Sequence, residues 1–235
     1  MTIENRLWGA ERIRGELLKL GVAVGKRTIQ RSMRGARPPR PAGQTWATFL
    51  RTHGPEIWAC DFLQLTDLFF RPVFAFFLVE LGSRRVVHVG VTRAPTGAWT
   101  AQQLREATPE GIGPRFLIHD AKYGPDFDRL AAASGIGVIR TPVQAPRANA
   151  VCERFLGSVR RECADHLLIL SERHLGRLLA EYVAHFNGAR PHQGIGQRVP
   201  AASAAAAPRS RTDGPHRVVG VPALNGLHHD YRWAA

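Results

Sequence analysis

The chain has 235 residues and a formal net charge of +13, from 32 Lys and Arg against 19 Asp and Glu. This charge favours a polyanionic partner, nucleic acid before a membrane, because neutralised phosphates release counterions; the alternative is a solubility device. No apolar run approaches the ~18 residues that span a bilayer, and the N-terminus has no signal-peptide core. Three cysteines without a CxxC pair predict a reduced cytosolic chain with no zinc site.

Two helices are predicted at the N-terminus. Residues 5–21 have helical periodicity, with Asn5 as N-cap and Gly21 at the C-terminal stop. The apolar face of this helix consists of Ala10, Ile13, Leu17 and Leu20. A second, basic helix over 26–34 follows, so residues 1–35 are interpreted as a helix-turn-helix-like DNA-binding segment, with an ordinary helical hairpin as the alternative. Its candidate phosphate contacts are Lys26, Arg27, Arg31 and Arg34.

Residues 36–52 are predicted to be a basic, proline-rich linker. Pro38, Pro39 and Pro41 favour an extended spacer. Between Lys26 and Pro55 there are seven Lys and Arg and no Asp or Glu. This stretch is either a solvated tether or an arm that lies along phosphates.

An α/β core is predicted from residue 53 to 190. Apolar runs at 57–65, 72–79 and 85–92 with short turns predict three antiparallel strands. A helix over 96–107 with Thr96 as N-cap follows, and then a strand, a short helix and a strand. Two longer helices, over 150–168 and 171–187, end the core. This order predicts a mixed sheet covered by helices.

Three carboxylates occupy different settings in this core. Asp61 lies inside an apolar strand, where a carboxylate without partners is costly; an edge-strand Asp facing water is the alternative, and Asp67 reads as a turn residue. Asp120 ends a strand, where open α/β sheets carry their sites. Glu153 lies off the apolar stripe of its helix, where an ordinary surface glutamate is common. Together they match a site with two metal ions about 3.5–4 Å apart, built from the oxygen ligands that Mg²⁺ prefers.

The C-terminal tail, residues 191–235, is predicted to carry a hairpin. The segments RVVGV and LHHDYRW flank Asn225-Gly226, a strong hairpin signal. His228, His229 and Asp230 suggest a metal, but neighbouring strand residues point to opposite faces, which favours a plain hairpin.

The chain resembles the DDE transposases of bacterial insertion sequences, which are related to retroviral integrases, and in particular the integrase core domain proteins. Seven stretches carry this resemblance: NRLWGAERIRGELLKLG, WATFLRTHGPEIWACDF, PTGAWTAQQLREA, RFLIHDAKYG, TPVQAPRANAVCERFLGSVRREC, YVAHFNGARPHQGI and GLHHDYRW.

The resemblance implies an RNase H-like fold and cleavage and joining of DNA strands with two Mg²⁺ or Mn²⁺ ions. It places catalysis and metal binding on Asp61, Asp120 and Glu153, with the stretch around Pro146 and Asn149 as a mobile active-site segment. It also implies transposon ends and target DNA as partners, a homo-oligomer on DNA, and a cytoplasmic, nucleoid-associated location. Further candidate DNA contacts are Lys122, Arg147, Asn149, Arg154, Arg160 and Arg161.

Two departures from the family pattern bear on activity. The family's usual first DNA-binding segment has no counterpart before WGAERI, and HDAKYG is two residues shorter than the RDRDAKF of relatives. Asp120 therefore either stays at the strand end, as a ligand, or matches the second Asp of that motif, with the ligand lost. The alternative functions are a DNA-binding remnant of a transposase and a stand-alone nuclease on the same fold.

Overall fold

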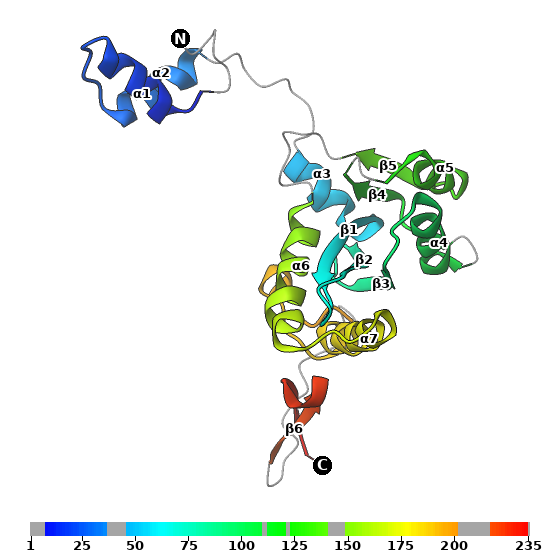
Figure 1. Ribbon diagram of the computed structural model, residues 1–235. Helices are drawn as coiled ribbons and strands as arrows, with labels where there is room; N and C mark the ends of the chain where they lie inside the picture. Colours follow the sequence, from blue (N-terminus) through cyan, green and yellow to red (C-terminus); the bar gives the residue numbers. More distant parts are fainter. Residues whose placement is uncertain are drawn as a thin grey trace. The chain divides into compact units, whose positions relative to one another are not determined.

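The computed structural model of the chain describes residues 8–36, 46–109, 112–120, 123–140, 149–201 and 217–234. It divides into two compact units, residues 1–45 and residues 46–235 (Figure 1). The division falls inside the predicted linker, because helix α3 (Trp46–His53) belongs to the second unit. Phe49 of α3 packs edge-on against Phe116, with 5.5 Å between ring centroids. No helix among the described residues is long and apolar enough to cross a membrane.

The first unit is a pair of helices, α1 (Ala10–Lys19) and α2 (Lys26–Ala36). Ile13, Ile29 and Met33 form its small buried core. Helix α1 begins later than predicted, after Gly9, and Asn5 lies outside the described residues. The expected apolar face also ends early, because Leu20 is 66% exposed.

Gly21 ends α1 as the sequence predicts. Its φ of +77° is a conformation that glycine adopts without a steric cost. The N–H of Val22 then turns back to the carbonyl of Leu17, at 2.8 Å, which satisfies one of the free carbonyls at the helix end.

The second unit is built on a five-stranded mixed sheet with the order β3-β2-β1-β4-β5. β1, β2 and β3 are antiparallel neighbours, whereas β4 and β5 run parallel to β1. The predicted arrangement of three antiparallel and two parallel strands is therefore confirmed. The strands are β1 (Ile57–Thr66), β2 (Pro72–Glu80), β3 (Val86–Thr92), β4 (Phe116–His119) and β5 (Gly137–Arg140).

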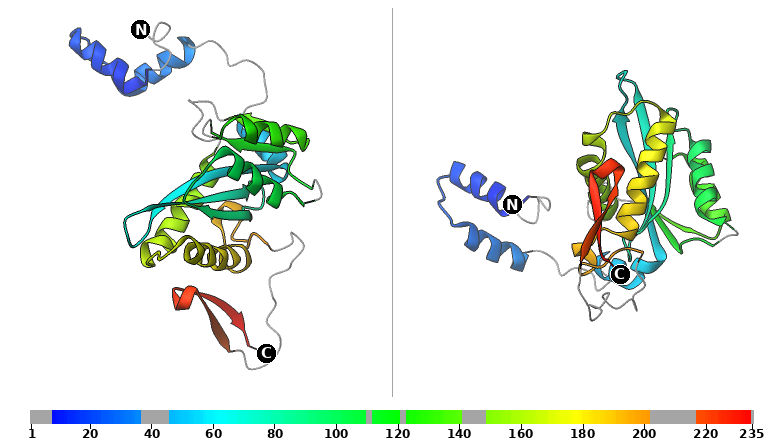
Figure 2. Two further views of the ribbon diagram at one scale, coloured as in Figure 1. Left: turned by 45° about the vertical axis from the view of Figure 1, so that its right-hand side comes forward. Right: turned by 90° about the horizontal axis from the view of Figure 1, so that it is seen from below.

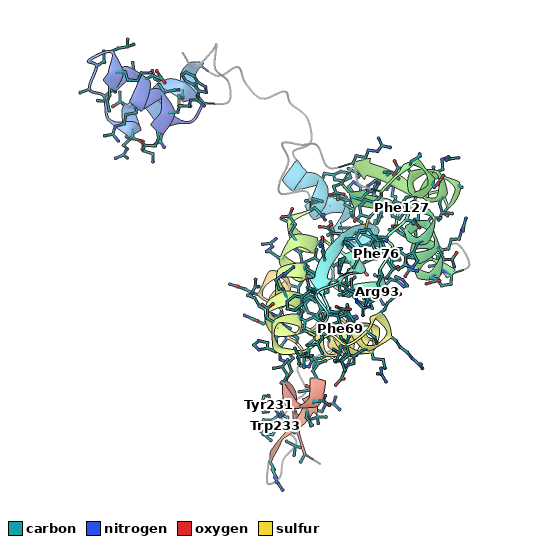
Figure 3. The ribbon with its side chains drawn as sticks, viewed as in Figure 1. Phe69, Phe76, Arg93, Phe127, Tyr231 and Trp233 are labelled. Atoms are coloured by element: carbon teal, nitrogen blue, oxygen red, sulfur yellow. The ribbon has the colours of Figure 1, made fainter. Side chains whose placement is uncertain are left out.

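Helices cover both faces of this sheet (Figure 2). α4 (Gly97–Ala107) and α5 (Pro125–Ala133) bury one face, around Phe76 and Phe127, which Figure 3 labels. α6 (Ala150–Glu162) and α7 (Glu172–Gly188) bury the other. Thr96 caps α4 as predicted, because its side chain accepts a hydrogen bond from the N–H of Trp99 at 3.2 Å.

Helix α6 is shorter than the predicted span of 150–168. It ends at Glu162, because Cys163 leaves the helical region with φ −135° and ψ −66°. A short 3-10 helix, η3 (Ala164–His166), follows. The apolar stripe on the helix is confirmed, with Cys152, Phe155, Leu156 and Val159 all buried.

The predicted C-terminal hairpin is present. β6 (Val218–Ala223) and β7 (His228–Trp233) pair antiparallel around the 3-10 helix η5 (Leu224–Gly226). Leu224 is buried, and its N–H donates to the carboxylate of Glu181 on α7. His228 donates from Nε2 to the carbonyl of Glu162, at 2.6 Å. The hairpin is therefore bonded to the end of α6 and to the middle of α7, while Tyr231 and Trp233 are exposed (Figure 3).

A buried carboxylate closes the turn between β1 and β2. Asp67 accepts hydrogen bonds from the backbone N–H groups of Phe69 and Arg71, both at 2.9 Å. It also pairs with the guanidinium groups of Arg71, at 3.1 Å, and Arg93, at 2.7 Å. Burial opposes its ionisation, but these donors outweigh burial and lower its pKa to about 2.

We expect Asp67 to make stability sensitive to acid. Because its folded-state pKa of about 2 lies below the ordinary 3.8, its contribution is complete above about pH 4 and is lost as the pH falls towards 2. Asp67→Asn should lower the urea midpoint at pH 7 and flatten its fall between pH 4 and 2. Urea titrations at several pH values would measure this, with exposed Asp126→Asn as control. An equally steep acid loss in Asp67→Asn would refute it.

Candidate active site

Asp61 lies in β1, and Asp120 directly follows β4, the parallel neighbour of β1. The register pairs Trp58 with Leu117 and ends at the pair of Ala59 and Ile118. Extended by two residues, it would set Asp61 beside Asp120, since neighbouring strands lie about 4.8 Å apart. Because side chains alternate along a strand, Asp61 falls on the face of Ala59, which α6 covers, and the same alternation would put Asp120 on that face.

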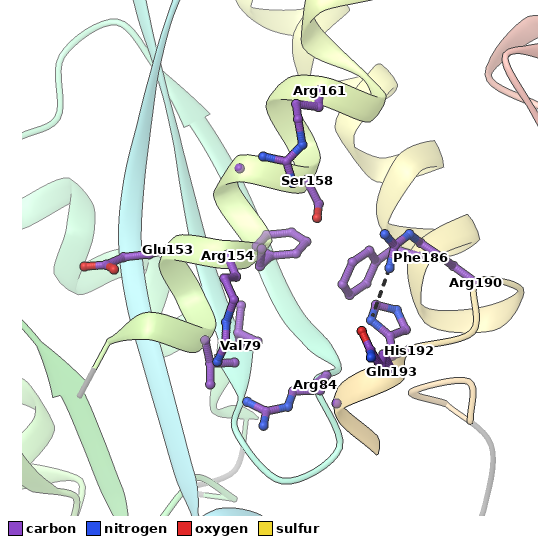
Figure 4. Close-up of a pocket in the computed structure, with 14 residues that line it drawn as sticks. Val79, Arg84, Glu153, Arg154, Ser158, Arg161, Phe186, Arg190, His192 and Gln193 are labelled. Atoms are coloured by element: carbon purple, nitrogen blue, oxygen red, sulfur yellow. Dashed lines mark hydrogen bonds between the residues drawn. The ribbon is translucent and has the colours of Figure 1, made fainter. Parts of the chain in front are cut away.

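Glu153 enters from the helix above that face. It lies in the first turn of α6, where a carboxylate is favoured by the helix dipole, and its side chain is exposed. Its neighbour Cys152 is fully buried against the sheet, so Glu153 lies at the edge of the contact between α6 and β1. In Figure 4 its carboxylate points away from the arginines that line the other flank of α6.

The acids influence two buried thiols. Burial raises the pKa of Cys60 well above its usual value, and Cys152, Asp61 and Asp120 raise it further. Burial likewise raises the pKa of Cys152, followed by the charges of Asp61 and Glu153. Asp61 therefore acts on both thiols, Asp120 on Cys60 and Glu153 on Cys152. Both thiols are fully buried.

A second layer of residues supports the end of β4. His119 is buried, with its ring 5.1 Å from that of Tyr123 and 5.3 Å from that of Phe127. Its Nε2 pairs with Asp128 at 2.8 Å, and Asp128 also pairs with Arg140 on β5. The chain from β4 through α5 to β5 holds the residue before Asp120 in place. Sequence patterns gave no sign of this network.

The donor chemistry of the three acids fits Mg²⁺ or Mn²⁺, which prefer oxygen ligands. Among the residues that the structure describes, no group of three or more His, Cys, Asp or Glu side chains is close enough to hold an ion. Asp61 accepts a hydrogen bond from the N–H of Phe62 at 2.8 Å, which holds one oxygen at its own strand. Carboxylates of like charge also repel one another. Their role as ligands stays a prediction.

The DNA contacts predicted in the first unit lie on α2. Lys26, Arg27 and Arg31 are exposed, and Lys26 forms an ion pair with Glu11 at 3.0 Å. The side chain of Arg34 lies outside the described residues. No finding tests their contact with DNA.

The DNA contacts predicted in the second unit occupy different surroundings. Lys122 and Arg147 lie outside the described residues. Asn149 precedes α6 and is only 6% exposed, so its side chain faces the interior. Arg160 is exposed and donates to the carbonyl of Gln64 at 3.0 Å, whereas Arg154 and Arg161 face a pocket on the other flank of α6.

That pocket has a volume of about 580 Å³ (Figure 4). It adds Arg84, Arg190, His192 and Gln193 to the two arginines of α6. None of these four was singled out from the sequence. The clearest signal is the high density of polar residues in ARPHQG, directly after α7.

The mixed sheet, with helices on both faces and acids at β1, at the end of β4 and on α6, defines an RNase H-like core. Residues 134–200 match the family model of the integrase core domain. The computed fold is similar to the HTLV-2 integrase catalytic core domain in complex with magnesium, with a TM-score of 0.50 and 14% identity over 63% of this chain and 94% of that chain. It is also similar to the simian T-cell lymphotropic virus intasome in complex with PP2A regulatory subunit B56 gamma, with a TM-score of 0.53 and 13% identity over 94% of this chain and 83% of that chain.

Curated relatives come from insertion elements. An IS476 protein of 39.2 kDa from Xanthomonas euvesicatoria is 28% identical over 171 residues, 71% of this chain and 49% of the relative. An IS407 protein of 31.7 kDa from Burkholderia multivorans is 26% identical over 155 residues, 64% of this chain and 55% of the relative. The chain spans about half the length of these relatives. The match of residues 134–200 to the integrase core domain and the similarity to insertion-element proteins agree with the resemblance inferred from the sequence.

Proposed function

We propose that this chain catalyses metal-dependent cleavage and joining of DNA strands in transposition. The observation that carries the proposal is the parallel pairing of β1, which holds Asp61, with β4, which Asp120 directly follows, beneath the helix that bears Glu153. A strand-end position for Asp120 supports the alignment in which the shortened HDAKYG segment keeps its ligand. The insertion-element relatives supply the reaction class.

In this proposal Asp61, Asp120 and Glu153 are the catalytic residues and hold two Mg²⁺ or Mn²⁺ ions. Bound there, the ions supply activation of water or of a 3′-hydroxyl and stabilisation of the attacking and leaving oxygens. The chain's own part is to fix the three carboxylates on rigid elements. The buried Cys152 helps to keep water out of the contact between α6 and the sheet.

The proposed partners are the transposon ends and the target DNA. Two ends must be held together during transposition, so a homo-oligomer on DNA belongs to the proposal. Lys26, Arg27 and Arg31 on α2 are the proposed contacts of the first unit, where their exposure allows them to reach phosphates. Residues 36–52, which are basic and proline-rich, add further positive charge to the chain and so strengthen its attraction to the same DNA.

The deciding experiment incubates the chain with the repeats that flank its reading frame and Mg²⁺ or Mn²⁺. Cut and joined strands, resolved on a denaturing gel, would support transposition. Hydrolysis with no joined product would select the stand-alone nuclease instead. Tight DNA binding with no cutting under either metal would select the DNA-binding remnant.

We expect DNA binding to weaken steeply with salt. The residues from Lys26 to Pro55 carry seven Lys and Arg and no acid, and each neutralised phosphate contributes about −0.9 to the slope of log K against log salt. Fluorescence anisotropy from low to physiological salt would measure the slope, and it should be several units negative. A slope near zero would contradict this expectation.

A further inference from the structure

The pocket beside α6 is built from three separate elements. Arg84 comes from the turn between β2 and β3, and Arg154 and Arg161 come from α6. Gln193 and Gly194 belong to the 3-10 helix η4 (Gln193–Ile195), which follows α7. The apolar part of its wall is formed by Val79, Val151, Phe155 and Phe186, and further polar residues line it, among them Glu153, Ser158, Arg190 and His192. We call this hollow the arginine pocket (Figure 4).

One arginine of this pocket already has a counter-ion. Arg190 donates two hydrogen bonds to the carboxylate of Glu162, from Nε at 2.9 Å and from Nη2 at 2.5 Å. The hydroxyl of Tyr182 donates to the same carboxylate at 3.0 Å. Arg190 therefore shapes the pocket, since its guanidinium also lies over the ring of Phe186, 5.5 Å from the centroid.

The other three arginines have no such partner. Within the described residues, Arg84, Arg154 and Arg161 form no ion pair with a carboxylate. Arg154 donates only from Nε to the carbonyl of Ala150, at 2.9 Å, so its terminal nitrogens remain available. Three positive charges that share one concave surface attract an anion strongly, because each hydrogen bond would be charge-assisted.

Arg84 has the least favourable surroundings of the three arginines, because its charge is partly buried beside another positive charge. Burial lowers its pKa, and the positive charge of Arg154, which lines the same pocket, lowers it further. Its backbone has φ +68°, a conformation that non-glycine residues rarely adopt and that concentrates at functional sites. Opposite its guanidinium lies Gly194, where an added Cβ would be 3.7 Å from Nε. Gly194 therefore leaves space beside the guanidinium group of Arg84.

A phosphate group matches this surface better than a carboxylate. The planar guanidinium fork binds phosphate oxygens in pairs, and three forks can share the oxygens of one or two phosphates. The negative charge of a bound phosphodiester would also offset the repulsion between Arg84 and Arg154. Glu153 contributes to the wall of the pocket while its carboxylate points to the opposite side, so the pocket and that carboxylate lie on two flanks of the same helical turn.

We propose that the arginine pocket binds a backbone phosphate of the DNA strand that leaves the three acids, and so fixes the path of that strand along one flank of α6. This proposal rests on the proposed function. Arg84 and Arg154 would be the main contacts, and Gln193 would add a neutral donor from η4. Arg160 lies on the opposite flank of the helix, bonded to Gln64, and takes no part.

The test compares Arg84→Gln and Arg154→Gln with Arg105→Gln, an exposed arginine on α4 with no place in either site. Each lost phosphate contact should make the salt slope of DNA binding less negative by about 0.9, and Arg105→Gln should leave it unchanged. Arg154 is exposed, so Arg154→Gln should fold normally. It can therefore still refute the proposal if Arg84→Gln fails to fold. Thermal unfolding would check both variants.

A second arm titrates the full chain with inorganic phosphate by calorimetry. Weak phosphate binding that disappears in Arg84→Gln, together with the slope change, supports the proposal. Phosphate binding that disappears while the DNA slope stays unchanged overturns it and marks the pocket as a site for a free phosphate. Unchanged slopes in both variants also overturn it, even where normal cutting shows that the proposed function stands. Conversely, if the variants changed the slope as expected but the chain cut no DNA, the pocket proposal would hold and the proposed function would fail.

Discussion

Asp61→Asn and Glu153→Gln should each abolish metal-dependent DNA cutting while the chain remains folded. Loss of a residue that merely orients a metal ligand typically costs about 10–100-fold, so loss of a ligand should cost more than about a hundredfold. The amides keep the size of the side chains and remove only the charge. Both sites are partly or fully exposed, so the fold does not depend on them.

Single-turnover cutting in Mg²⁺ and in Mn²⁺ would measure this effect, with circular dichroism as the check on folding. Glu172→Gln on α7 is the matched control, because it also lies in the first turn of a helix but far along the chain from the three acids. Cutting at the unchanged rate by either active-site variant would remove that residue from the site. DNA binding at fixed salt should remain, since neither carboxylate contacts phosphate directly.

Phe76→Ala should lower the free energy of unfolding by about 3–5 kcal/mol, the usual cost of removing a buried phenyl ring. Phe76 has no exposed surface, and four rings surround it with centroids 5.1 to 6.4 Å away. Those rings belong to Phe62, Trp99, Tyr123 and Phe127. The cavity left behind would lie beneath the strand that carries Asp61.

Urea unfolding would compare Phe76→Ala with Phe70→Ala at the tip of the turn between β1 and β2. Phe70 is 90% exposed, so its removal should change stability by less than about 0.5 kcal/mol. Phe76→Leu, which fills part of the cavity, should recover much of the loss. Equal stability of the Phe76→Ala and Phe70→Ala variants would show that the cluster of rings does not hold the sheet to α4 and α5.

The sequence allowed the sheet and the position of the acids to be predicted because both depend on local pattern. The apolar runs of the strands, the cap at Thr96 and the stripe of Cys152 and Phe155 are each readable within about ten residues. The ends of helices were less readable: α6 stops at Glu162 because the backbone at Cys163 turns, and no proline or glycine announces that turn.

The arginine pocket could not be predicted, because its residues are far apart in the chain. Arg84 and Arg154 meet only after β2 and β3 have paired and α6 has packed on the sheet. The pairing of Arg190 with Glu162 decides which arginine is neutralised and which are not, and composition carries no sign of this choice. For Asp120 the sequence left two alignments open, and only the register of β4 favours one of them.

The parallel pairing of β1 with β4 has a consequence for how the chain folds. β1, β2 and β3 follow one another through short turns, so this meander can close early at a small cost in chain entropy. The pairing of Ile57 with Phe116 joins residues far apart in the chain, and such long-range contacts slow folding. We therefore expect the mutual repulsion of Asp61 and Asp120 to arise late in folding, when most of the apolar surface is already buried.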